Sequence, residues 1–100
     1  MKNKAYRIRV TDDVVALIRG MHPELKKKVK SAFEILSAEP DSGKALKNEL
    51  EGLMSFRVSR FRIIYRVFKK RQIEVVAIGP GMSIYKETLR MIRRENESLG

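Results

Sequence analysis

The stretch from Leu53 to Tyr85 constrains the fold of this chain most, because apolar and polar residues alternate along it. Alternation with a period of two places one set of side chains on each face of a β-strand. The stretch divides into three such segments. A short polar link, Lys69–Arg71, lies between the second and third segments, and Gly79–Gly81 breaks the pattern after the third. These features predict three successive strands.

The same stretch carries positive charge with no local compensation. Its basic residues before the first acidic one, Glu74, are Arg57, Arg60, Arg62, Arg66, Lys69, Lys70 and Arg71. The whole chain has 22 Lys and Arg against 12 Asp and Glu, a net charge of +10 over 100 residues. Like charges on neighbouring strands repel. The imbalance therefore predicts a polyanionic partner, RNA or DNA first, and makes an acidic partner protein physically plausible.

The N-terminal part predicts one strand and two helices. Tyr6 to Val10 alternates as a half-buried strand, and Thr11 is a suitable N-cap for a helix that ends at Gly20. Pro23 suits the first position of a second helix. The apolar face of this second helix is Leu25, Val29, Ala32, Phe33 and Leu36.

The remaining segments complete a single domain. Residues 44–51 fit either a helical turn or an extended lead-in to the strands. Ser83 is expected to cap a final helix, and the polar tail 95–100 is expected to fray. The resulting order, β-α-α-β-β-β-α over residues 1–100, predicts a small α+β domain. We expect an antiparallel sheet with the helices packed on one side.

The composition excludes several kinds of site. The chain has no cysteine and one histidine, His22, which the start of a helix at Pro23 explains sufficiently. No carboxylates cluster at ligand spacing and no phosphate-binding glycine loop is present, so neither a metal nor a cofactor is expected. No apolar run approaches the roughly 18 residues of a membrane span. The N-terminal segment lacks the apolar core of a signal peptide. A cytoplasmic protein is therefore expected.

The arginines of the predicted strands indicate which chemistry is possible without a metal or a cofactor. Arg57 and Arg62 should project from the same face of the sheet, where guanidinium groups can bind phosphate oxygens in a bidentate way. RNA carries its own nucleophile, the 2′-hydroxyl, so metal-free cleavage needs alignment, charge stabilisation and proton transfer. Tyr85 is a candidate for the proton transfer, and packing along Leu89 and Ile92 is its alternative.

Other basic residues are candidates for holding RNA phosphates. On the second predicted helix they are Lys26 and Lys27, and on the strands they are Arg60 and Arg66. A solvated helix surface is the alternative for the two lysines.

Short motifs along nearly the whole chain resemble the RelE/ParE superfamily of toxins from toxin–antitoxin modules. The motifs are Leu46-Lys47, Gly52-Leu53, Phe56-Arg57-Val58, Phe61-Arg62-Ile63-Ile64-Tyr65-Arg66-Val67, Val75-Val76-Ala77-Ile78-Gly79 and Ile84-Tyr85. The resemblance implies a concave basic surface on the sheet. It also implies RelE-type cleavage of mRNA in the ribosomal A site without a metal, and a cognate antitoxin, often acidic, that blocks the site. By position, Arg57 and Arg62 match the basic active-site residues of that family, and Tyr85 matches its tyrosine.

The chain departs from the family pattern at two places. Ser59 stands where a second basic residue is common, and Arg60 replaces that residue only if a bulge turns it inward. No base lies between Gly79 and Ser83, where members usually carry an arginine. The first expectation is a ribosome-dependent mRNA endoribonuclease. The alternatives are a ParE-like toxin that inhibits DNA gyrase without cutting RNA, and an attenuated toxin fold that binds only RNA or antitoxin.

Overall fold

The computed structural model describes the backbone of residues 5–99 and the side chains of residues 5–95. The elements in chain order are β1 (Arg7–Val10), α1 (Asp12–Arg19), α2 (Pro23–Ala38), η1 (Pro40–Ser42), β2 (Lys44–Ala45), η2 (Asn48–Leu50), β3 (Met54–Val58), β4 (Phe61–Phe68), β5 (Gln72–Pro80) and α3 (Gly81–Leu99). This confirms the α+β fold, with the short β2 and the 3-10 turn η2 in the ambiguous segment 44–51. Residues 1–4 and 100 of the predicted domain lie outside the described residues.

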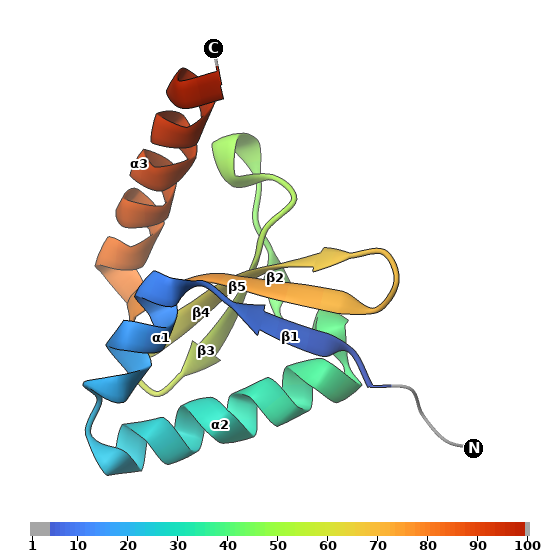
Figure 1. The fold of residues 1–100 in the computed structure, drawn as a ribbon, viewed down its shortest axis with the longest axis vertical. Coiled ribbons are helices and arrows are strands. Elements are labelled where there is room, and N and C mark those ends of the chain that lie inside the picture. Colours follow the sequence, from blue (N-terminus) through green and yellow to red (C-terminus); the bar gives the residue numbers. More distant parts are fainter. Residues whose placement is uncertain (1–4, 100) are drawn as a thin grey trace.

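The strands form one sheet in the order β1-β5-β4-β3-β2 (Figure 1). Strands β2 to β5 pair antiparallel, as predicted. The prediction was wrong for β1, which pairs in parallel with β5, so the sheet is mixed. Because two helices and three strands separate β1 from β5, no short turn joins them. A parallel pair needs such a long connection.

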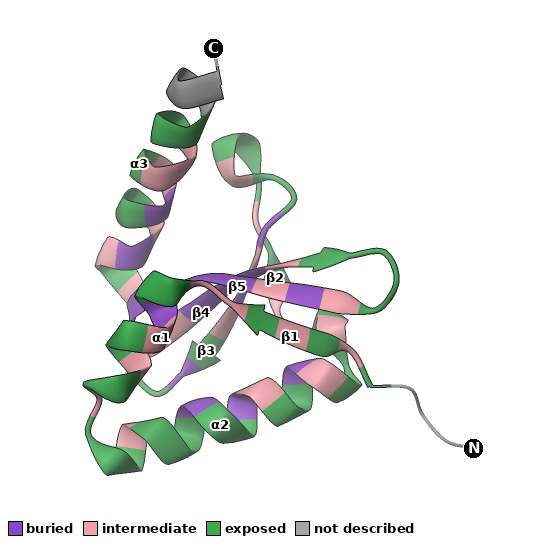
Figure 2. Cartoon of the chain, viewed as in Figure 1, coloured by how far each residue is buried: buried purple, intermediate pink, exposed green. Residues whose placement is uncertain are grey.

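The helices cover both faces of the sheet, not one face as predicted. Helices α1 and α2 pack on one face, where Val29 and Leu36 contact a cluster that includes Ile63 and Tyr65. Helix α3 packs Ile84 against the other face (Figures 1 and 2). The reason lies in β4, whose consecutive residues 63 to 65 are all 0% exposed. A strand that is apolar on both faces has to be covered on both.

A β-bulge on β5 places two consecutive residues on the face of the sheet that α3 covers. Ile64 pairs with Ala77 and Tyr65 pairs with Val75, which leaves Val76 as the extra residue on β5. The bulge lets Val76 and Ala77 both pack in the α3 cluster. Beyond it, Arg62 pairs with Gly79, next to the start of α3.

The ends of the helices follow the local sequence, with two differences that both concern α3. Thr11 Oγ1 accepts a hydrogen bond from Val14 N at 3.3 Å, and His22 Nδ1 accepts one from Glu24 N at 3.1 Å. Both are N-cap contacts, as the sequence predicted for Thr11. Helix α3, however, begins at Gly81 directly after β5, earlier than the predicted cap at Ser83. Its backbone also continues through residues 95–99, where a frayed tail was expected. No helix in the described part of the chain is long and apolar enough to span a bilayer.

A buried tyrosine ties the β2 segment to the centre of the sheet. Tyr65 Oη donates to the Pro40 carbonyl oxygen at 2.8 Å and accepts from Gly43 N at 3.0 Å. Burial raises the pKa of the Tyr65 phenol; the Gly43 hydrogen bond opposes this, and the nearby Asp41 adds to it. A Cβ at Gly43 would lie 2.5 Å from Tyr65 Oη and 2.8 Å from the Ser55 carbonyl oxygen. The close packing of β2 on β3 therefore requires glycine here.

Gly43→Ala is expected to destabilise the protein by about 1–3 kcal/mol, because neither the buried Tyr65 nor the β3 backbone can move aside freely. The free energy of unfolding in urea measures this. Gly20→Ala is the matched control, since its Cβ would meet no atom closer than 3.7 Å and its φ of −87° suits any residue. An equal loss in both variants would contradict the packing argument.

Candidate functional site

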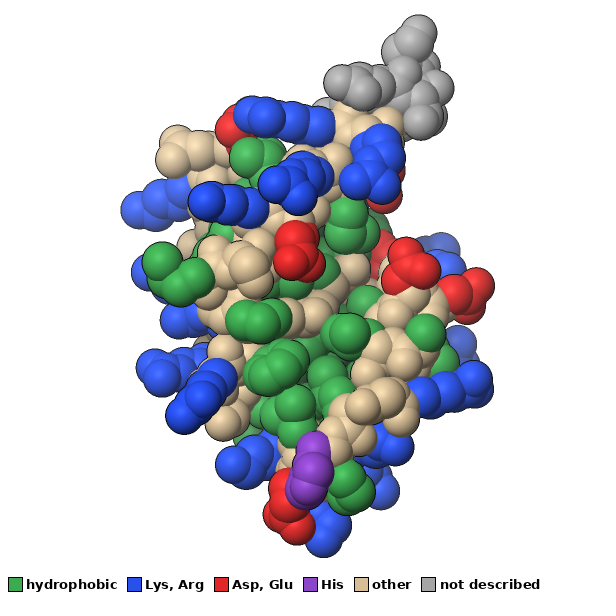
Figure 3. All heavy atoms as spheres, turned by 90° about the vertical axis from the view of Figure 1, so that its left-hand side faces the viewer, with side chains coloured by type: hydrophobic (Ala, Val, Ile, Leu, Met, Phe, Trp, Pro, Cys, Tyr) green, Lys and Arg blue, Asp and Glu red, His purple; other side chains and the backbone are tan. Residues whose placement is uncertain are grey.

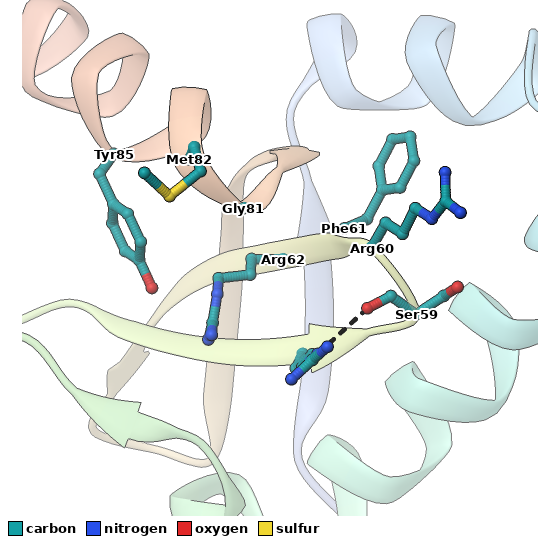
Figure 4. A pocket seen from close by; sticks show the side chains of 8 residues that line it. Ser59, Arg60, Phe61, Arg62, Gly81, Met82 and Tyr85 are labelled. Atoms are coloured by element: carbon teal, nitrogen blue, oxygen red, sulfur yellow. Dashed lines mark hydrogen bonds between the residues drawn. The ribbon is translucent and has the colours of Figure 1, made fainter.

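A pocket of about 350 Å³ lies between the β3–β4 turn and the first turn of α3 (Figure 4). Its lining residues are Arg57, Ser59, Arg60, Phe61, Arg62, Gly81, Met82 and Tyr85. Gly81 N donates to the Arg60 carbonyl oxygen at 3.1 Å, which fixes the turn against the helix. The fold thus brings Arg57, Arg62 and Tyr85 to one place, although they come from β3, β4 and α3.

The two strand arginines are direct cross-strand neighbours. Arg57 pairs with Arg62 in the β3–β4 register, so both side chains project from the same face of the sheet, as predicted. That face is the one on which α3 packs, whereas a face without helices was expected. Arg57 Nε donates to the Ser59 carbonyl oxygen at 3.2 Å (dashed in Figure 4). Within residues 5–95, neither guanidinium forms an ion pair with a carboxylate. Two like charges held side by side without a counter-ion make a site for an external anion.

A buried serine joins the second arginine to the tyrosine. Arg62 Nη1 donates to Ser55 Oγ at 3.3 Å, and Ser55 Oγ shares a hydrogen bond of 3.0 Å with Tyr85 Oη. The Arg62 guanidinium carbon also lies 5.9 Å from the centre of the Tyr85 ring. Ser55 is only 2% exposed. A buried hydroxyl therefore holds together the phenol and the guanidinium, which both line the pocket.

Sequence reasoning missed Ser55. The available signal was its position two residues before Arg57, which places both on the same face of β3. That spacing shows the shared face but not the contact with Tyr85, which depends on how α3 crosses the sheet.

The segment 79–83, which lacks a base, forms the end of β5 and the start of α3. Gly81 and Met82 line the pocket, so the positive end of the α3 dipole adjoins it. A Cβ at Gly79 would meet Ile84 Cδ1 at 2.9 Å, whereas a Cβ at Gly81 would lie an ordinary 3.6 Å from Arg62 Nε. The backbone therefore has room for a side chain at Gly81 and not at Gly79.

The residues predicted to hold RNA phosphates lie in three different places. Arg60 lies in the β3–β4 turn at the pocket but points away from Arg62 and Tyr85 (Figure 4), and no bulge turns it inward. Arg66 is on the same face of the sheet, near a separate small cavity, with its Nε 3.6 Å from Glu74 Oε1. Lys26 and Lys27 lie on α2, which covers the opposite face.

The outer surface shows the charge imbalance directly. On the face that contains His22, apolar side chains gather near the centre and Lys and Arg side chains lie along both edges (Figure 3). In the part of the chain that the structure describes, no group of three or more His, Cys, Asp or Glu side chains could hold a metal ion.

The sequence of this fold matches a known family over most of its length. Residues 9–85, from β1 to Tyr85, match the family described as ParE toxin of type II toxin–antitoxin system, parDE. The chain belongs to this toxin family. The superfamily resemblance seen in the strand motifs is thereby confirmed. Every residue that lines the pocket lies within the matched range.

Solved toxin structures share the fold. The toxin–antitoxin complex RelBE2 from Mycobacterium tuberculosis is 28% identical, covering 79% of this chain and 94% of that one, with a TM-score of 0.69. The archaeal RelE–RelB complex from Pyrococcus horikoshii OT3 is 24% identical, covering 78% and 98%, with a TM-score of 0.65. A mutant of the Escherichia coli toxin RelE in the free state is 16% identical, covering 89% and 97%, with a TM-score of 0.69. No curated protein sequence matches the chain significantly.

Proposed function

We propose that this toxin is a metal-free endoribonuclease that cuts ribosome-bound mRNA in the cytoplasm and so blocks translation. The observation that carries the proposal is the hydrogen-bonded set Arg62–Ser55–Tyr85 beside Arg57, which forms no ion pair with a described carboxylate. This set offers two cations for a phosphate and a phenol for a hydroxyl within one pocket. The RelE names of the solved relatives agree with this reading of the pocket.

The proposed reaction uses the nucleophile of the RNA itself. The 2′-oxygen attacks the adjacent phosphorus and the bond to the 5′-oxygen breaks, which leaves a 2′,3′-cyclic phosphate and a 5′-hydroxyl. Arg57 and Arg62 stabilise the negative charge that develops on the phosphorane oxygens. The Tyr85 phenol orients the 2′-hydroxyl or moves its proton, and the proton finally resides on the leaving oxygen.

The natural inhibitor in this proposal is a cognate antitoxin. Relatives of the same fold crystallise as toxin–antitoxin complexes. A net charge of +10 favours an acidic segment of the antitoxin, which would compete with RNA for the basic pocket.

A second candidate function is ParE-like inhibition of DNA gyrase without RNA cleavage. Two observations favour it: the matched family carries the ParE name, and no base lies between Gly79 and Ser83 at the pocket. A pocket with fewer cations stabilises a phosphorane less, so binding without cleavage is then the simpler use of the same surface.

In vitro translation and gyrase supercoiling assays on the same purified protein decide between these functions. We expect message cut within codons only when ribosomes are present, with supercoiling unaffected. Intact message with inhibited supercoiling would overturn the proposal in favour of the second candidate. Intact message with active gyrase would leave a toxin fold that binds only RNA or antitoxin.

Ser55→Ala is expected to lower mRNA cleavage about 10- to 100-fold, because Tyr85 and Arg62 lose the hydroxyl that holds them together. Primer extension on the message after in vitro translation measures the rate. Thr88→Val is the matched control, since it removes another buried hydroxyl of the α3 face, one that bonds only to the Ile84 carbonyl oxygen. Equal cleavage by the Ser55 variant and the unmodified protein would show that Ser55 has no positioning role.

A further inference from the structure

A second groove, of about 400 Å³, lies between α2 and β3. It exists because the sheet ends early at this edge: β2 pairs only with Met54 and Ser55, and leaves the outer edge of β3 from Phe56 onward uncovered. Lining residues from α2 are Glu24, Lys27, Lys28, Ser31, Ala32 and Ile35, and those from β3 are Phe56, Arg57 and Val58.

The groove adjoins the candidate active site. Arg57 lines both the groove and the pocket that contains Arg62 and Tyr85. A strand of RNA whose phosphate lies between Arg57 and Arg62 therefore meets the groove as it passes over the β3 edge. In the described part of the chain no strand separates the two, since β2 begins only at Lys44, opposite Ser55.

The lining of the groove suits a nucleotide. Its floor is apolar, with a half-buried Phe56 and with Ile35, which is 46% exposed although it is a large aliphatic residue. Its rim carries Lys27, Lys28 and Arg57 against one acidic residue, Glu24. Single-stranded nucleic acids bind to surfaces of this kind, with bases on an apolar or aromatic floor and phosphates along a basic rim.

We propose that this groove binds the nucleotide next to the cleaved phosphate, so that single-stranded RNA runs from the pocket over the β3 edge to α2. The inference rests on the proposed ribonuclease function and adds the path of its substrate. It also divides the lysines of α2. Lys28 lines only this groove and Lys27 lines both, and the two contact RNA, whereas Lys26 and Lys30 line only a different groove with Ile18 and Phe33.

The division supplies a matched pair of variants on one helix. Lys28→Ala and Lys30→Ala remove the same charge from exposed positions of α2, but only Lys28 lines the proposed path. The probe is a fluorescent 2′-O-methyl oligouridylate about ten nucleotides long, which the toxin cannot cleave. Fluorescence anisotropy over a series of salt concentrations measures its dissociation constant.

We expect Lys28→Ala to weaken binding about five-fold and to reduce the slope of log K against log salt by about 0.7, the value for one phosphate contact on a single strand. Lys30→Ala should change neither quantity appreciably. A second pair tests the floor: Ile35→Glu should weaken binding at least as much, whereas Leu17→Glu, at a position 44% exposed on α1, should weaken it less.

The outcomes test the proposed RNA groove and the proposed ribonuclease function separately. Suppose that the unmodified toxin cuts message but the two lysine variants weaken binding equally. Only total charge then matters for binding, so the proposed RNA path is wrong while the ribonuclease function stands. If the toxin cuts no message but Lys28→Ala alone weakens binding, the RNA groove stands and the ribonuclease function fails. If the unmodified toxin does not bind the oligonucleotide at all, both are overturned, and an acidic protein segment becomes the better occupant.

Discussion

Arg62→Ala is expected to reduce ribosome-dependent mRNA cleavage about 100- to 1,000-fold, the loss typical when one donor to a developing negative charge is removed. Arg62 contributes in two ways. Its guanidinium stands opposite Arg57 across β3 and β4, and its Nη1 donates to the serine that holds Tyr85. Alanine removes both, so the turnover number should fall more than the affinity for RNA. Primer extension on translated message, with toxin concentration varied, measures both quantities.

Arg19→Ala is the control for loss of charge, because Arg19 is exposed at the end of α1 and lines no part of the pocket. Its cleavage rate should stay within about two-fold of the unmodified toxin. Urea unfolding of both variants tests whether the fold is intact. A folded Arg62→Ala toxin that still cuts message at the normal rate would exclude Arg62 from the reaction.

Gly81→Arg is expected to raise cleavage about 10- to 100-fold, since it returns a cation to the segment where the family usually carries one. The structure identifies Gly81 as the suitable position. A Cβ there makes only ordinary contacts, the nearest at 3.6 Å from Arg62 Nε, whereas a Cβ at Gly79 would overlap Ile84. Cleavage in vitro and growth arrest on expression in cells both measure the gain.

Gly81→Gln controls for the added side chain without the charge, and we expect it to leave the cleavage rate nearly unchanged. Both variants replace glycine within a helix, which favours the helix slightly. If Gly81→Arg folds but neither cleavage nor toxicity rises, the missing base is not what limits activity, and gyrase inhibition becomes the better explanation of the toxin.

Much of the site followed from local patterns. The alternation of β3 and β4 places Arg57 and Arg62 on one face, because a strand turns each successive side chain by half a revolution and the connecting turn is short. The apolar spacing of α2 likewise predicted its buried residues Val29, Ala32 and Leu36. Both patterns depend only on neighbouring residues, so a single sequence contains them.

Other features depended on contacts between distant segments. Ser55 looks like an ordinary strand residue until α3 brings Tyr85 to 3.0 Å from its hydroxyl. The lysines of α2 are equivalent in sequence. Lys28 and Lys30 line different grooves only because α2 packs in one rotational orientation against the open edge of β3. The alternating pattern of β4 predicted cover on one side only, whereas its residues Ile63, Ile64 and Tyr65 are buried by helices on both faces of the sheet.

The sequence by itself determined the strands other than β2, the second helix, the excess of positive charge and the toxin family, because these depend on periodicity, composition and short motifs. The tertiary structure decided the parallel pairing of β1, the placement of α3 on the second face, and the start of α3 at Gly81. It also decided that Arg57, Arg62 and Tyr85 meet in one pocket, and that the buried Ser55 bonds to two of them. Contacts between such distant segments form when the whole chain buries its apolar residues together, and local sequence preferences do not specify them.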